Sequence, residues 1–222
     1  MESFAGNVRG QRGDRITGPV DQTLRYHSAV QPGLGRGFAA AASGVFLLAA
    51  LSFVPLARFL HYARLGLSER GPSLLLVVPV VLAATLLHEA VVRGALYGAV
   101  GSRMAVGAAA PVVALLGAVL PAYLRLQLLP RGTAPLGVLA GHAFLVEAGL
   151  GLGLCLLALA AGSAVPGAIA YGLLWITRFG LAVTFVGSVV PMMELASAWA
   201  TPLVLALVLA RPLAPWREEL LG

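Results

Sequence analysis

The segment LGVLAGHAFLVEAGLGLGLCLLALAA, residues 136–161, decides the fold class of this chain. It is almost wholly apolar, and as an α-helix it is long enough to cross the roughly 30 Å hydrocarbon core of a bilayer. Similar apolar runs recur through the sequence. The 222 residues are 59% hydrophobic and 11% charged, with a mean hydropathy of +0.90, whereas about a quarter of the residues in a soluble domain are charged. The sequence therefore predicts an all-α, polytopic membrane helical bundle.

We predict six membrane-spanning helices, because lipid offers no hydrogen-bond partner to an open backbone. They are expected at about residues 37–60, 73–100, 105–124, 136–161, 164–177 and 181–209. Residues 37–210 would form the membrane domain, and residues 211–222 a short C-terminal tail. The Arg- and Gly-rich residues 1–36 are expected to form a polar tail that is flexible or lies on the membrane surface, where it could contact anionic headgroups.

The arginines between the spans set the expected orientation. The side of the two termini would carry eight of them: Arg9, Arg12, Arg15, Arg25, Arg36, Arg103, Arg211 and Arg217. The opposite side would carry six: Arg58, Arg64, Arg70, Arg125, Arg131 and Arg178. We therefore expect both termini in the cytoplasm and a location in the inner (cytoplasmic) membrane of a bacterium. The net charge of +6 is scattered without a basic stripe, so it does not indicate a nucleic-acid partner.

A second stretch, LLHEAVVRGALYGAVGSR at residues 86–103, places ionisable side chains inside an apolar helix. Such groups cost about 2.5–3.5 kcal/mol each to insert, so they usually face a partner or a cavity. Thr85, Glu89, Arg93 and Tyr97 are spaced by four and share one helix face. Glu89 and Arg93 are placed for an i,i+4 ion pair, which predicts a structural tie between this helix and its neighbours.

His88 and Glu89 also begin a sequence that could bind zinc. A His-Glu-x-x-His helix would put two histidines on one face. The residues that follow, Ala90 to Arg93, contain no second histidine, and the arginine would repel a metal ion. A zinc site of this type is therefore not predicted.

Three further ionisable residues fall at membrane depth: His142, Glu147 and Glu194. His142 is expected to be a hydrogen-bonding core residue, and it does not closely share a face with Glu147, five positions on. Glu147 needs a partner or a proton. We expect Glu194 to pair with an arginine such as Arg93 or Arg178, or to lie near a membrane interface.

Two other residues are interpreted more simply. Cys155 has no second cysteine to pair with and no Cys–His metal pattern around it, so it is expected to be a small core or lipid-facing residue. Arg178 is expected at a helix end, from which its side chain can reach the interface.

The stretch HEAVVRGALYGAVGSR, residues 88–103, resembles the first motif of the CPBP intramembrane proteases, the family of CAAX-prenyl and bacteriocin-processing type. That motif reads Glu-Glu-x-x-x-Arg and is typically followed by glycine. Glu89, Arg93 and Gly94 match it, and His88 occupies the position of the first glutamate.

The resemblance continues downstream in the order and spacing of the segments, and it covers roughly residues 74–176. VLPAY stands where the family has Phe-x-x-x-His, with Tyr123 at the histidine. GSAVPGAIAYGLLW stands where the family has His-x-x-x-Asn or Asp, with Tyr171 at the histidine and Trp175 at the last position.

In this family the first glutamate is thought to activate water, and the two histidines and the asparagine bind or polarise the reacting centre. All four are replaced here. A tyrosine, with a pKa of about 10, is a poor base and a poor zinc ligand at neutral pH, and an indole only donates hydrogen bonds. The resemblance therefore implies a degenerate site without a cofactor. Such a chain would act as a pseudoprotease or as a structural or assembly subunit of a membrane complex.

Two alternatives remain open. An active peptidase with a displaced site would use zinc together with His88, Glu89, His142 and either Glu147 or Glu194. A subunit that binds pigment or lipid could use His88 and His142 as ligands of a porphyrin-type cofactor. In every case we expect membrane lipids and other membrane protein subunits as partners.

Overall fold

The computed structural model describes residues 35–59, 63–67, 74–128, 135–185 and 189–214. Its helices are α2 (Gly35–Leu51), α3 (Phe53–Phe59), α4 (Leu74–Glu89), the π-helix η2 (Ala90–Leu96), α5 (Tyr97–Gly101), α6 (Val106–Leu128), α7 (Leu136–Ala161), α8 (Val165–Gly180) and α9 (Val189–Leu213). Two five-residue strands, β1 (Ala63–Leu67) and β2 (Leu181–Phe185), pair antiparallel, with Ala63 opposite Phe185 and Leu67 opposite Leu181. The predicted helical membrane bundle is confirmed.

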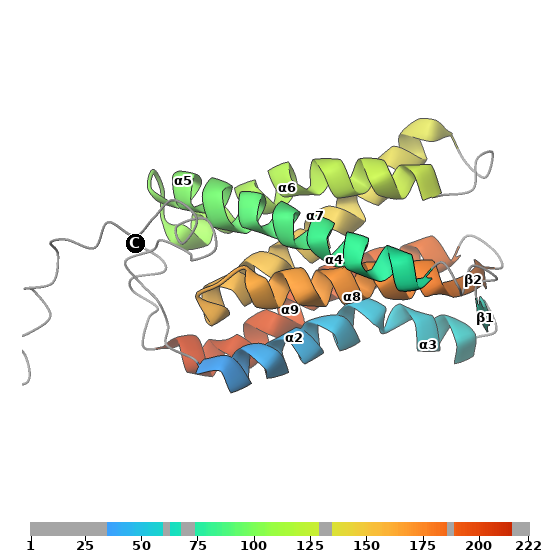
Figure 1. Cartoon of the computed structure of the whole chain (residues 1–222), viewed down its shortest axis with the longest axis horizontal. Helices are drawn as coiled ribbons and strands as arrows, with labels where there is room; N and C mark the ends of the chain where they lie inside the picture. The colour runs from blue at the N-terminus through green and yellow to red at the C-terminus, as the bar shows by residue number, and fades with distance from the viewer. Residues whose placement is uncertain (1–34, 60–62, 68–73, 129–134, 186–188, 215–222) are drawn as a thin grey trace, which may run out of the picture.

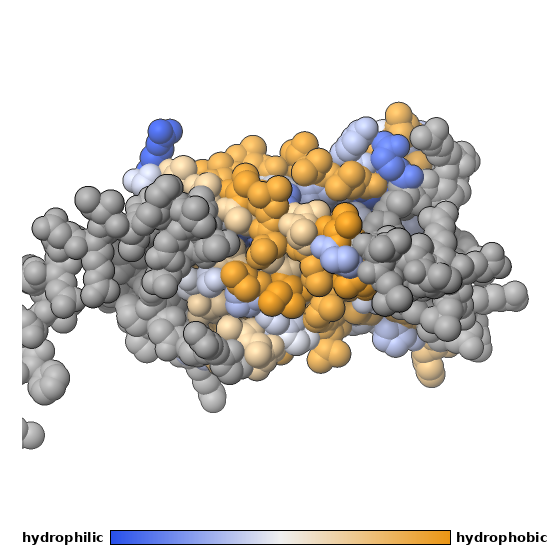
Figure 2. Space-filling model, in the orientation of Figure 1, coloured by the Kyte–Doolittle hydropathy of each residue, from blue (hydrophilic) through white to orange (hydrophobic). Residues whose placement is uncertain are grey.

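Five helical segments are long and apolar enough to cross a membrane: Phe38–Leu56, Val78–Gly101, Gly107–Gln127, Leu136–Ala161 and Pro191–Ala210. A shorter apolar segment, Val165–Thr177, belongs to α8. These segments run alternately in opposite directions, so α2 begins and α9 ends on the same side of the bundle (Figure 1). A broad apolar band covers the middle of the face in Figure 2, as expected for contact with lipid. The chain is thus a helical integral membrane protein, and the side that faces the cytoplasm stays a prediction.

The predicted bounds of two spans are wrong. Residues 181–185 form β2, so the last helix begins at Val189 and not near Leu181. An apolar run of this length does not by itself distinguish a strand from a helix. The third span continues to Leu128, which places Arg125 inside α6 and not in the loop after it. Residues 1–34 and 215–222, most of the two predicted tails, lie outside the described residues.

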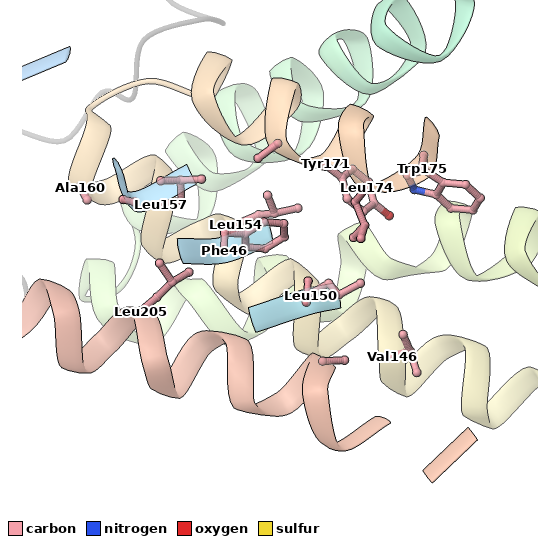
Figure 3. Packing of buried hydrophobic residues seen from close by; sticks show 14 of the residues in the cluster. Phe46, Val146, Leu150, Leu154, Leu157, Ala160, Tyr171, Leu174, Trp175 and Leu205 are labelled. Atoms are coloured by element: carbon pink, nitrogen blue, oxygen red, sulfur yellow. The ribbon is translucent and has the colours of Figure 1, made fainter. Parts of the chain in front are cut away.

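Helix α7 is the central element of the bundle. Its bounds, Leu136–Ala161, are those predicted from the sequence, and 78% of its membrane window is buried inside the protein. It packs against α6, α9, α2 and α8, while α4 packs mainly against α8. One core cluster brings Phe46 of α2 together with Leu150 and Leu154 of α7, and Tyr171 and Trp175 of α8 belong to the same cluster (Figure 3).

Glycine lets α7 approach α9 closely. A Cβ atom at Gly149 would lie 3.0 Å from the carbonyl carbon and oxygen of Ala198, which is closer than nine in ten real Cβ contacts. Gly149→Ala is expected to lower the free energy of unfolding by about 1–3 kcal/mol, because the backbone of α9 would have to move. Gly141 offers a matched control on the same helix, since a Cβ atom there would meet nothing within 4 Å. Thermal unfolding in detergent compares the two variants, and equal stability would contradict the close contact.

Candidate functional site

Glu89 and Arg93 form a buried ion pair at the junction of α4 and η2. Arg93 Nη1 donates to Glu89 Oε1 at 2.5 Å, and the two residues are only 2% and 0% exposed. Arg93 Nη2 also donates to the backbone carbonyl of Gly151 at 3.1 Å, where a larger residue would crowd the guanidinium. The two charges of the pair therefore compensate each other, and the arginine also holds the α4–η2 helix against α7.

The π-helical turn of η2 contains Arg93, and the sequence analysis did not anticipate it. A π-helix has a wider turn than an α-helix, and such turns often occur at functional sites. Here it carries the arginine whose second nitrogen reaches the carbonyl of Gly151 on α7. The sequence pattern of these residues does not distinguish such a turn from the α-helix on either side.

His88 joins the same group and extends it to α6. Its Nδ1 lies 3.2 Å from Glu89 Oε1, and its Nε2 lies 3.1 Å from the carbonyl oxygen of Gly117. A carbonyl and a carboxylate only accept, and a neutral imidazole has one N–H. Which of the two contacts the ring donates depends on its tautomer, and each ring nitrogen lies within hydrogen-bond distance of one neighbour. Both ring nitrogens are therefore engaged with neighbouring groups.

One carboxylate oxygen in this group is different. Glu89 Oε2 is buried and has no hydrogen-bond partner among the described residues. It faces α8, where a Cβ atom at Gly167 would lie 3.6 Å from it. Because a buried polar atom without a partner is costly, Glu89 depends strongly on the partners of its other oxygen, His88 and Arg93.

A second polar cluster ties four helices together. Arg125 of α6 contacts Glu147 of α7 through Nη1 at 3.2 Å, and its Nη2 forms an ion pair with Glu194 of α9. Tyr171 of α8 donates its hydroxyl to the other oxygen of Glu147 at 2.6 Å. Arg125, Glu147 and Tyr171 are 7%, 2% and 4% exposed, so this cluster lies within the bundle.

Arg125 is the member that sequence reasoning missed. Glu194 does pair with an arginine, but that arginine is Arg125 and not Arg93, which binds Glu89 and Gly151 instead. A signal was present, since two glutamates in later spans need a cation. Arg178 is predicted to extend its side chain to the membrane interface. That side chain is not among those that the structure describes, so this stays a prediction.

His142 and Cys155 have separate surroundings. His142 Nε2 lies 2.9 Å from the carbonyl oxygen of Pro191, which links α7 to α9. His142 and Glu147 thus contact different neighbours, in line with their spacing. Cys155 is fully buried in a core cluster with Val92, Tyr97 and other apolar residues.

The three aromatic residues placed by the family resemblance do not gather at one point. Tyr171 lies beside His88, with ring centroids 6.2 Å apart, and Trp175 meets the Tyr171 ring edge-on at 6.3 Å. His88, Tyr171 and Trp175 line one pocket of about 350 Å³ between α4, α6 and α8. Tyr123 is 60% exposed and is not among the residues that line this pocket.

In the part of the chain that the structure describes, no group of three or more His, Cys, Asp or Glu side chains could hold a metal ion. The convergence of His88, Glu89 and His142 that a displaced zinc site requires is thus not seen among these residues. Comparison with protein-family models, with curated proteins and with solved structures finds no match.

Proposed function

We propose that this chain is a catalytically inactive relative of the CPBP intramembrane proteases and acts as a structural or assembly subunit, or as a pseudoprotease, of a membrane complex. The observation that carries the proposal is the use made of the residues at the family's catalytic positions. His88 bridges Glu89 and Gly117, and Tyr171 donates to Glu147. Tyr123 is exposed on α6 and does not line the pocket beside His88. The polar atoms of His88 and Tyr171 thus join helices, and Tyr123 lies apart from the pocket that these two residues line with Trp175.

The same contacts speak against a displaced peptidase and against ligation of a pigment by these histidines. A displaced peptidase site needs a free base and a metal, but both nitrogens of His88 are engaged and His142 contacts Pro191. Ligation of a pigment by His88 would require its Nε2 to leave the carbonyl oxygen of Gly117. Each alternative would therefore have to break a contact that joins two helices.

The subunit role is tested on the native membrane. The tagged 22.8 kDa chain is extracted in mild detergent, and its size and composition are measured by native mass spectrometry. We expect one membrane protein to accompany it in fixed stoichiometry, through contacts of its lipid-facing surface. Recovery of the chain as a monomer alone would contradict the subunit role.

His88→Gln separates the inactive subunit from a displaced peptidase. Glutamine can still donate to the Gly117 carbonyl, but it cannot act as a base or bind zinc well. We expect the variant to replace the parent chain in cells and to retain the same partner. Loss of the cellular phenotype with the assembly intact would overturn the inactive assignment.

A further inference from the structure

The pocket beside His88 has the shape of a slot. Its α4 wall runs from Val80 to His88, which is about 12 Å of helix, and its α6 wall runs from Leu120 to Gln127, which is about 10 Å. It therefore follows the helix axes, which is also the direction of lipid chains in a bilayer. Its volume of about 350 Å³ lies at the lower end of the range for ligand pockets.

The slot opens toward the lipid. Three residues of its rim, Val80, Leu120 and Leu124, are 67%, 56% and 49% exposed, and all lie in segments long enough to span the membrane. At this depth the surrounding phase is hydrocarbon and not water. Apolar cavities of this kind stay free of water and accept apolar molecules.

At the inner end of the slot, the polar groups of the described lining residues are already engaged within the protein. The Thr85 hydroxyl donates to the carbonyl oxygens of Val81 and Leu82, and Tyr171 donates to Glu147. Since the His88 nitrogens are also engaged, this end suits a hydrocarbon chain and not a polar molecule.

The outer end of the slot is different. Gln127 lies one residue before the end of α6, and Trp175 lies in the last turns of α8. Tryptophan and polar side chains at helix ends are typical of the membrane–water interface. An ester group could therefore lie at this end while its chain fills the slot.

We propose that the slot holds one acyl chain of a bilayer phospholipid, with its methyl end beside His88 and its ester end beside Gln127 and Trp175. This binding site goes beyond the proposed function and does not depend on it, because it rests on the shape, depth and lining of the slot. An inactive subunit and an active enzyme could each hold such a lipid.

The test uses the full chain in phosphatidylcholine liposomes that contain a phosphatidylcholine with a diazirine on its acyl chain. After illumination, labelled residues are mapped by mass spectrometry, and we expect labelling to concentrate on the slot. Ala84 lines the slot, so Ala84→Phe should lower this labelling at least about fivefold. Ala83 is its matched control, because it is exposed on the same helix but does not line the slot. Ala83→Phe should leave the labelling unchanged.

A second pair of variants lies on the opposite wall of the slot. It tests whether an acyl chain occupies the slot even if Ala84→Phe does not fold. Leu124→Trp should fill the slot from α6, whereas Leu116→Trp changes a similarly exposed residue of α6 outside it. Equal labelling of the slot and of exposed positions such as Leu48 and Leu207, unaffected by the filling variants, would overturn the proposal. Native mass spectrometry that finds a different kind of molecule in the slot would also overturn it.

Discussion

Replacing Arg93 with methionine is expected to lower the free energy of unfolding by about 3–5 kcal/mol, the usual cost of removing one partner from a buried ion pair. Among the residues that the structure describes, the buried Glu89 carboxylate would keep only the His88 ring beside Oε1 and would have no partner for Oε2. The carbonyl of Gly151 would also lose its donor from Arg93. Thermal unfolding of the purified chain in detergent, followed by circular dichroism, measures the change.

Arg103→Met is the matched control for this experiment. Arg103 lies just beyond the end of α5, is exposed, and has no carboxylate partner among the described residues. Surface substitutions of this kind usually change the free energy of unfolding by less than about 0.5 kcal/mol. If Arg93→Met were as stable as Arg103→Met, the buried pair would not hold α4 and η2 against α7.

Arg125→Met should have an effect of at least similar size. Arg125 contacts both Glu147 of α7 and Glu194 of α9. Its removal would therefore break both of these ion pairs at once. We expect a loss of about 3–5 kcal/mol or more and a sharp fall in the folded protein recovered from membranes. Recovery by size-exclusion chromatography and the unfolding temperature measure the two effects.

Arg125→Lys refines this prediction. Lysine keeps the charge but lacks the planar fork with which Arg125 reaches two carboxylates at once. Its stability should therefore fall between those of the parent chain and Arg125→Met. If Arg125→Met were recovered as well as the parent chain, the four-helix cluster would not be a main source of stability.

Local features of the fold could be predicted because lipid restricts the backbone conformations that a membrane-spanning segment can adopt. The apolar run of residues 136–161 has to be helical in a membrane, and its length matches α7. The Glu89–Arg93 pair follows from a spacing of four on one helix. Both features depend only on residues close together in the sequence.

The contacts between helices could not be predicted in the same way. His88 meets Gly117 and Arg125 meets Glu147 because separate helices pack in one particular arrangement, which spacing along one helix does not determine. The slot beside His88 exists for the same reason. The strand at residues 181–185 could not be predicted, because a short apolar run is compatible with either a strand or a helix.

The most direct test of the structural role of the site is a double-mutant cycle on Glu89 and Arg93. It compares unfolding free energies for Glu89→Leu, Arg93→Met, the double variant and the parent chain. We predict that each single variant is strongly destabilised and that the double variant recovers most of the loss, because no buried charge is left unpaired. Residues kept for catalysis often reduce stability, so their removal tends to be neutral or stabilising. Single variants as stable as the parent chain, with no coupling between the two sites, would contradict a structural role for this pair.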